Sequence, residues 1–332
     1  QRPFGGGGER MSAAAEITVG VDLGGTNVRA GAVTAEGQLL EWAETLIEAR
    51  RGPQAGVERI ASVVETVSAG RRLLAVGIGA TGRIDRQRGA IQNPYTLPTW
   101  EDVDIVQPLR QAFGVPVALE NDADAAALGE WWQGAGRGVE RLLAVTVGTG
   151  IGTAFIYRGH IYRGVDGWHG EGGHIRLDPN GPPCYCGGRG CWESLAAGPA
   201  IARDLQAAVR QKPSSRMLEL AGGEVSRVDA AVMAQAARQG DPLALEWTAR
   251  LGGIYGMGLV NLILLLLPDA IVLGGGVMRS FDLFEEPIRA AAASVQPVVP
   301  AERVTIQPAQ LGQQAGVLGA ARAALDLLQE TA

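Results

Sequence analysis

The stretch Ile17-Thr-Val-Gly-Val-Asp22-Leu-Gly-Gly-Thr26-Asn-Val-Arg-Ala-Gly-Ala-Val33 contains two short apolar runs on either side of a glycine-rich turn. Residues 16–21 predict a β-strand, and residues 28–33 predict a second strand that begins directly after the turn. This order of strand, glycine turn and strand predicts a hairpin that opens an α/β domain. Glycine also lets backbone N–H groups come close to phosphate oxygens, so the turn is a candidate phosphate site.

The same order of elements returns in the second half of the chain. Residues 142–147 predict a strand, Gly148-Thr149-Gly150-Ile151-Gly152 a glycine turn, and residues 153–157 a returning strand. The turn is not a dinucleotide fingerprint, because its third glycine would fall at Thr153 and a strand follows in place of a helix. The repetition predicts two topologically similar domains that face each other across a cleft.

Strands and helices also alternate elsewhere in the chain, as in α/β proteins. Further strands are expected at residues 73–78, 115–119 and 270–273. Helices are expected at residues 53–69, 123–132, 199–211, 227–239 and 242–267, and a final helix after Gly316.

Composition limits the classes of function. The 332 residues carry a net charge of −6 and no basic block, which argues against non-specific binding to nucleic acid. Lys212 is the only lysine and lies in a polar stretch, which excludes a P-loop lysine and disfavours a Schiff base. Residues 262–267, the longest apolar run, are too few to span a bilayer, and no secretory signal is visible. We therefore expect a cytoplasmic protein, with residues 1–10 a disordered tail or an expression remnant.

All three cysteines fall in Cys184-Tyr-Cys186-Gly-Gly-Arg-Gly-Cys191, and His174 lies ten residues before the first. Clustered thiols with a nearby imidazole predict a tetrahedral structural zinc site. A disulfide would leave one cysteine over, and Cys184 and Cys186 are too close in sequence to pair comfortably. The alternative is a set of ordinary small apolar residues in a tight loop. Of the other two histidines, we interpret His160 as a surface residue. We place His169 outside the metal site, because no cysteine lies at a useful spacing from it.

Several polar residues near the predicted strand ends and the zinc loop suit a sugar and a phosphate donor. Asp122 follows a predicted strand and is either a helix N-cap or a base that accepts a hydroxyl proton, with Asn121 holding neighbouring hydroxyls. Glu171 and Glu193 flank the zinc loop, and carboxylates can accept several O–H bonds from a polyol. Asp22 could hold a magnesium ion or its waters, which phosphoryl transfer requires.

A third glycine run, Gly274-Gly275-Gly276, follows the strand expected at residues 270–273. Ligands of open α/β sheets bind beyond the carboxyl ends of strands, so this run is a candidate nucleoside site. A plain strand-to-helix turn explains it about as well.

The chain resembles the ROK family of sugar kinases and sugar-responsive repressors, and the bacterial glucokinases in particular. The family's most specific segment, Cys-x-Cys-Gly-x-x-Gly-Cys-x-Glu, is present from Cys184 to Glu193. Its Glu-x-Gly-His element resembles residues 171–174, and its two phosphate motifs resemble residues 22–26 and 148–152. Residues 120–123, Glu-Asn-Asp-Ala, resemble the catalytic segment.

This resemblance implies an actin-like (ribonuclease H-like) two-domain α/β fold with an interdomain cleft. Residues 11–126 and 317–332 would form the small domain, and residues 127–316 the large domain with the zinc loop. The implied reaction is ATP- and Mg²⁺-dependent phosphorylation of a hexose, glucose to glucose 6-phosphate, with Asp122 as the base. The implied sugar-binding residues are Gly82, Asn93, Asn121, Asp122, Glu171, His174 and Glu193. Those implied for ATP and Mg²⁺ are Asp22, Gly24, Gly25, Thr26, Asn27, Gly148, Thr149, Gly150, Gly152, Gly274, Gly275 and Gly276. The implied zinc ligands are His174, Cys184, Cys186 and Cys191.

Three segments depart from the usual family pattern near the expected sugar pocket: residues 81–82, 93–98 and 167–170. A kinase for another sugar, such as N-acetylmannosamine or fructose, therefore stays an alternative. A second alternative is a sugar-sensing regulator of the same family without its DNA-binding domain, since the 21 residues before Asp22 offer no recognition helix. Relatives are commonly homodimers or homotetramers, and the implied partner is a small-molecule sugar, with no nucleic acid and no membrane.

Overall fold

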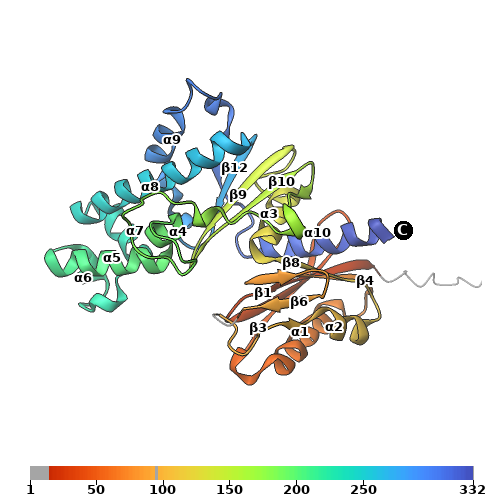
Figure 1. The fold of residues 1–332 in the computed structure, drawn as a ribbon. Helices are drawn as coiled ribbons and strands as arrows, with labels where there is room; N and C mark the ends of the chain where they lie inside the picture. The colour runs from red at the N-terminus through yellow and green to blue at the C-terminus, as the bar shows by residue number, and fades with distance from the viewer. Residues whose placement is uncertain (1–14, 94–95, 332) are drawn as a thin grey trace, which may run out of the picture.

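The protein's structure, a computed structural model, describes residues 15–93 and 96–331. Two five-stranded sheets form the centres of two lobes, and helices α3 and α10 lie between them (Figure 1). The tail expected at residues 1–10 lies outside the described residues, as do Pro94 and Tyr95 of the segment 93–98.

The first sheet has the strand order β3-β2-β1-β4-β8. Its strands are β1 (Glu16–Leu23), β2 (Asn27–Val33), β3 (Leu39–Leu46), β4 (Arg72–Ala80) and β8 (Val117–Asn121). The first three pair antiparallel, whereas β4 and β8 continue the sheet in parallel. Helices α1 (Pro53–Ser68) and α2 (Val106–Phe113) contribute buried apolar residues to the core of this lobe. A small sheet lies beside it, formed by β5 (Arg83–Asp85), β6 (Ala90–Gln92) and β7 (Val103–Asp104).

The second sheet repeats this topology, with the order β11-β10-β9-β12-β13. Its strands are β9 (Arg141–Val147), β10 (Ile151–Tyr157), β11 (His160–Ile161), β12 (Ala270–Gly274) and β13 (Thr305–Pro308). The hairpin strands are antiparallel and the later two are parallel, as in the first sheet. The structure therefore confirms the predicted pair of topologically similar α/β halves.

The second half carries most of the helices. They are α4 (Trp192–Ala196), α5 (Gly198–Gln211), α6 (Arg216–Leu220), α7 (Ala230–Arg238), α8 (Pro242–Leu266) and α9 (Glu285–Ala293). The helix expected at residues 227–239 begins only at Ala230, because Asp229 caps it and residues 225–227 form a separate 3₁₀ turn.

Helix α8 is the described helix that is long and apolar enough to cross a membrane by length and composition. It is instead packed in the core of the second lobe, where Leu251, Leu259 and Ile263 are buried. Gly258 lies directly against the ring of Trp192, so that a Cβ atom there would be 2.3 Å from it. The apolar character of α8 is explained by this packing.

The last helix, α10 (Gln314–Thr331), packs against α3 (Asp122–Gln133) and against β1 and β4 of the first sheet. Glycines let the backbones approach closely: a Cβ atom at Gly20 would lie 1.9 Å from the carbonyl oxygen of Val317. At Gly77 it would lie 1.8 Å from the carbonyl oxygen of Ala320. The expectation that the helix starts after Gly316 is wrong, because Gly316 belongs to the first turn and packs against Asp22.

Candidate active site and zinc cluster

The candidate base Asp122 is the first residue of α3 and follows β8 without a loop. The N-cap of this helix is Asn121, whose Oδ1 accepts hydrogen bonds from the backbone N of Ala123 at 2.8 Å and of Asp124 at 3.4 Å. The interpretation of Asp122 as the N-cap is therefore wrong, although its Oδ1 also accepts from Ala123 N at 2.9 Å. Its carboxylate lies near Asp22 and Thr81 of the first lobe and near His169 of the second.

The charge state of Asp122 is set by burial and by a second carboxylate. Burial, with a smaller effect of the nearby Asp22, raises the pKa of Asp122 to about 6. The N–H of Ala123, the hydroxyl of Thr81 and the charge of His169 act in the opposite direction. Such a group is ionised at neutral pH and has a pKa close enough to neutrality to take up a proton in a reaction.

Asp22 lies near the end of β1, where burial raises its pKa and Arg29 opposes that rise. Arg29 Nη1 lies 3.1 Å from Asp22 Oδ2. Two neighbouring carboxylates with raised pKa values offer hard oxygen ligands and gain stability from an added cation. The donor chemistry therefore fits Mg²⁺, with Asp22 as the residue that would hold the ion or its waters.

Three expected sugar-binding residues come together beside Asp122. Gly82 has a φ of +99°, which favours glycine, and its carbonyl accepts a hydrogen bond from Asn121 Nδ2 at 3.1 Å. Asn93 is buried, and its Nδ2 donates to the carbonyl of Thr81 at 3.0 Å. The two amides thus fix the loop that carries Gly82 next to the candidate base.

The other three expected sugar-binding residues come from the second half of the chain. Glu193 in α4 accepts a hydrogen bond from the backbone N of Ile151 at 2.8 Å, so the second glycine turn holds it in place. A Cβ atom at Gly150 would lie only 2.5 Å from Glu193 Oε2, which explains the glycine there. His174 ends a 3₁₀ turn that follows Glu171, and its Nε2 lies 3.2 Å from the hydroxyl of Tyr185.

One charged residue at this site was missed in the sequence. His169 Nδ1 lies 3.2 Å from Asp124 Oδ1, and its Nε2 lies 3.4 Å from Glu171 Oε1. Hydrogen bonds to these two carboxylates raise the pKa of His169 to about 10, so the ring is protonated at neutral pH. The departure from the family pattern at residues 167–170 was the signal that could have drawn attention to it.

The second and third glycine runs meet at a cavity of about 700 Å³. Gly148, Thr149 and Gly276 line it, together with Arg238 of α7 and Arg279. Gly275 has a φ of +90° and lies against β9, where a Cβ atom would be 2.4 Å from the carbonyl oxygen of Val147. The lining combines residues of two glycine turns with two arginines, which suits a phosphorylated nucleoside.

The first glycine turn lies at the tip of the β1–β2 hairpin, outside the residues that line this cavity. The backbone N of Gly24 donates to the carbonyl of Asn27 at 3.0 Å. Asn27 Nδ2 donates to Glu44 Oε1 at 2.7 Å, so its side chain is directed toward β3. A Cβ atom at Gly25 would lie 2.9 Å from the carbonyl oxygen of Thr96, which brings this turn beside the loop of Asn93.

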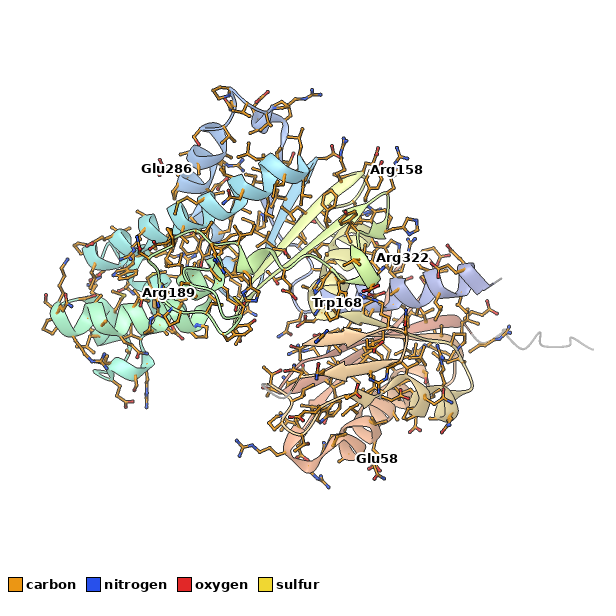
Figure 2. The ribbon with its side chains drawn as sticks, in the orientation of Figure 1. Glu58, Arg158, Trp168, Arg189, Glu286 and Arg322 are labelled. Carbon is orange, nitrogen blue, oxygen red and sulfur yellow. The ribbon has the colours of Figure 1, made fainter. Side chains whose placement is uncertain are left out.

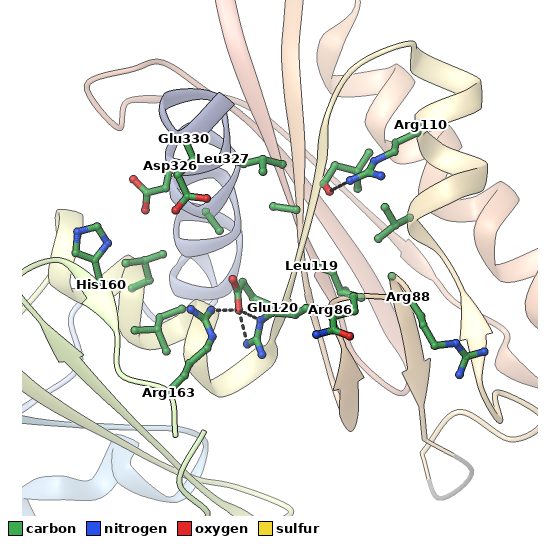
Figure 3. A pocket seen from close by; sticks show the side chains of 18 of the residues that line it. Arg86, Arg88, Arg110, Leu119, Glu120, His160, Arg163, Asp326, Leu327 and Glu330 are labelled. Atoms are coloured by element: carbon green, nitrogen blue, oxygen red, sulfur yellow. Dashed lines mark hydrogen bonds and ion pairs between the residues drawn. The ribbon is translucent and has the colours of Figure 1, made fainter. Parts of the chain in front are cut away.

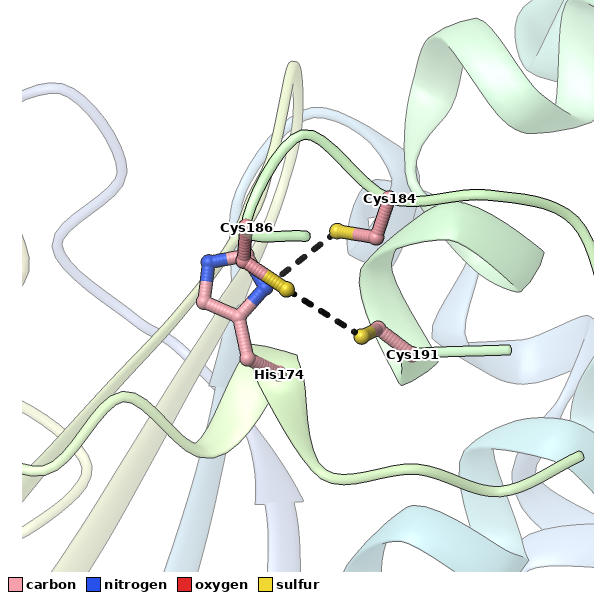
Figure 4. Close-up of side chains that lie close together, drawn as sticks. All are labelled: His174, Cys184, Cys186 and Cys191. Carbon is pink, nitrogen blue, oxygen red and sulfur yellow. Dashed lines mark hydrogen bonds between the residues drawn. The ribbon is translucent and has the colours of Figure 1, made fainter. Parts of the chain in front are cut away.

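The four predicted zinc ligands form one cluster (Figure 4). Their donor atoms all lie within 4.8 Å of one another, with Cys184 Sγ 3.5 Å from His174 Nδ1 and Cys186 Sγ 3.6 Å from Cys191 Sγ. Tetrahedral zinc with Zn–S bonds of about 2.3 Å requires sulfur atoms roughly 3.8 Å apart. The cluster therefore fits a four-ligand zinc ion, which His174 would bind through Nδ1, the ring nitrogen beside the Cys184 thiol.

A second cavity, of about 510 Å³, lies where the two lobes and α10 meet (Figure 3). Its wall contains an ion cluster in which Glu120 accepts from Arg86 Nε at 2.9 Å and from Arg163 Nη2 at 2.6 Å. None of the residues expected from the sequence to bind sugar, nucleotide or metal lines it. The cavity is therefore part of the junction between the lobes.

Comparison with known proteins places these features in a family. The ROK family profile matches residues 18–326. The glucokinase of Thermotoga maritima is 38% identical over 307 residues, which cover 91% of this chain and 95% of the relative. The ROK hexokinase of Thermus thermophilus has a TM-score of 0.80 at 34% identity and matches over 95% of this chain and 99% of its own. A ROK family glucokinase from Streptomyces griseus, solved with glucose and AMPPNP, has a TM-score of 0.79 at 36% identity over 93% and 99%. With a family match over nearly its whole length and the actin-like two-domain fold of these kinases, this chain belongs to the ROK family.

Proposed function

We propose that this protein is a sugar kinase that transfers the γ-phosphoryl group of ATP to the 6-hydroxyl of glucose. The observation that carries the proposal is the position of Asp122, a carboxylate with a pKa of about 6 that lies near Asp22 of the first glycine-rich segment. Its chain neighbours are Asn121, which bonds to Gly82, and Ala123, against which Gly152 of the second turn packs. The similarity to glucokinases at 36–38% identity over most of the chain supports glucose as the acceptor.

Asp122 would act as the general base. It accepts the proton of the 6-hydroxyl while that oxygen attacks the γ-phosphorus, and the bond from phosphorus to the β-phosphate oxygen breaks to release ADP. A positioned base of this kind contributes roughly 10²–10⁴-fold in rate. Asp22 would hold Mg²⁺ or its waters, and the ion would supply charge neutralisation at the phosphates.

The remaining residues would hold the two substrates in place. Glu171, His174 and Glu193 would bind sugar hydroxyls from the second lobe, while Asn93, Asn121 and Gly82 would bind them from the first. The cavity at Gly148, Thr149 and Gly276 would take the nucleoside and its phosphates. Orientation of this kind lowers the entropic part of the barrier to reaction.

The Cys₃His cluster would hold a structural zinc ion that supports the sugar site. His174 Nδ1 lies beside the Cys184 thiol, and Nε2 lies 3.2 Å from the hydroxyl of Tyr185, which interacts with Glu193; a bound zinc would hold the ring in this orientation. With four protein ligands such an ion would have no open position for a substrate, so its role would be structural.

The test is a coupled assay of ADP release with ATP and Mg²⁺ across glucose, fructose and N-acetylmannosamine. We expect glucose to have the highest kcat/KM. A higher kcat/KM for N-acetylmannosamine or fructose would identify that sugar as the acceptor and leave the proposed reaction unchanged. No ADP release with any sugar would overturn the proposal. Light scattering on the same preparation checks the expected homodimer or homotetramer.

A further inference from the structure

The loop between β11 and the zinc cluster, residues 163–171, is tied to the first lobe at several points. Arg86 Nη1 donates to the carbonyl of Gly167 at 3.0 Å. The guanidinium of Arg83 lies 4.3 Å from the ring centre of Trp168, which Figure 2 shows between the two lobes. A cation stacked on a tryptophan face is a favourable contact. The loop is therefore held against the first lobe immediately before His169, whereas Gly170 and Gly172 after it bond to Thr153 of β10.

The contact made by His169 is an ion pair with Asp124. The side chain of Asp124, its partner on α3, is fully buried, and a buried carboxylate requires cations or hydrogen-bond donors close by. Arg86 Nη2 at 3.1 Å is one such donor, and His169 Nδ1 at 3.2 Å is the other. The Asp124 contact thus fixes the orientation of the His169 ring, so that its second nitrogen faces Glu171.

Glu171 gains a fixed position from this arrangement. Its side chain is 60% exposed, and an exposed glutamate has several rotamers of similar energy. Oε1 lies 3.4 Å from His169 Nε2, which leaves Oε2 available for a sugar hydroxyl. The pKa of Glu171 is lowered chiefly by the hydrogen bond from His169, so the carboxylate stays ionised.

We propose that His169 is a positioning residue that bridges the buried Asp124 and the sugar-facing Glu171, and so sets the affinity for the sugar. This inference rests on the proposed sugar kinase activity, because it assigns Glu171 to the sugar site. Its effect on substrate affinity should fall on the sugar and not on ATP, since neither His169 nor Glu171 lines the cavity assigned to the nucleotide.

The experiment is a double-mutant cycle of His169→Ala and Glu171→Gln, with KM for glucose, KM for ATP and kcat measured for each protein. We expect His169→Ala to raise the KM for glucose about tenfold, the change that corresponds to about 1.4 kcal/mol. KM for ATP should stay within about twofold. In the Glu171→Gln background the same change should have almost no further effect, because the two residues act as a unit.

His160→Ala is the matched control, because His160 is exposed on β11 and touches none of the proposed sugar ligands. It should leave all three constants unchanged. If His169→Ala is unstable, His169→Gln keeps one donor group at the position and is expected to fall between wild type and alanine in glucose KM. Additive effects of His169→Ala and Glu171→Gln, or an unchanged glucose KM, would overturn this inference. A wild-type protein that phosphorylates no sugar would instead overturn the proposed function.

Discussion

Gly319 of α10 and Ala125 of α3 meet backbone to backbone, so that a Cβ atom at Gly319 would lie 1.6 Å from the carbonyl oxygen of Ala125. The contact places the last helix of the chain against the helix that begins with the candidate base. Gly129 of α3 has the same relation to α10, with its Cβ position 2.1 Å from the carbonyl oxygen of Ala315. The helix pair therefore depends on glycine at both positions.

The first prediction concerns this helix pair. Gly319→Ala should lower the free energy of unfolding by about 1–3 kcal/mol or more, since an added methyl group forces two packed helices apart. Gly253→Ala in α8 is the matched control, because its Cβ position has no atom within 4 Å. There alanine should stabilise the helix by up to about 1 kcal/mol. Urea unfolding of both variants measures the difference, and equal effects would contradict the packing argument.

The second prediction concerns Asp122→Asn. We expect the variant to lose about 10²–10⁴-fold in kcat, because the asparagine amide cannot accept the hydroxyl proton. It should nevertheless be more stable than wild type at pH 7, by about 1–2 kcal/mol, since burial of an ionised carboxylate is unfavourable. This stability gain should shrink as the pH falls through 6 and vanish below about pH 4, where Asp122 is protonated in the folded and unfolded states. Thermal unfolding across this pH range and the ADP assay test both parts; near-normal turnover would exclude Asp122 as the base.

The third prediction is the pH dependence of the wild-type enzyme. Because the ionised form of Asp122 is the one that accepts a proton, kcat/KM should rise with pH and reach half its plateau near pH 6. The raised pKa of Asp22 acts in the same direction, since its ionised form is the one that suits a cation. A series of kcat/KM measurements from pH 5 to 8 at constant ionic strength tests this. A flat profile between pH 5 and 7 would be incompatible with an Asp122 pKa near 6.

The fourth prediction concerns the Cys₃His cluster. Elemental analysis should find close to one zinc per chain, and removal of the metal by a chelator should lower Tm, because the four ligands then lose the bond that joins two segments of the loop. Glucose KM should rise more than ATP KM, since His174 and Glu193 adjoin the cluster. Added zinc should restore both values. Metal-free protein with unchanged Tm and unchanged glucose KM would exclude a structural role.

Much of the fold was predictable because it depends on local patterns. The two hairpins, the parallel strands β4, β8 and β12 and most helices were expected from apolar runs and glycine turns, and the structure has them within a few residues. The parallel strand β13 was not expected. The gathering of the three cysteines was predictable from their spacing, since three thiols within eight residues cannot lie far apart. The start of α10 was misjudged because glycine ordinarily weakens a helix, whereas Gly316 lies inside one where it packs on Asp22.

By itself, the sequence determined the type of protein: its strand and turn pattern, its three clustered cysteines and the ROK motifs each occupy short stretches whose chemistry is local. Only the tertiary structure decided which polar residues act together. Asn121 as the cap beside Asp122 is a matter of backbone geometry, and the pairing of His169 with Asp124 spans 45 residues of chain. The spacing of residues along the chain does not indicate such a contact, because the contact forms only when the loop of residues 163–171 packs against the helix that begins at Asp122.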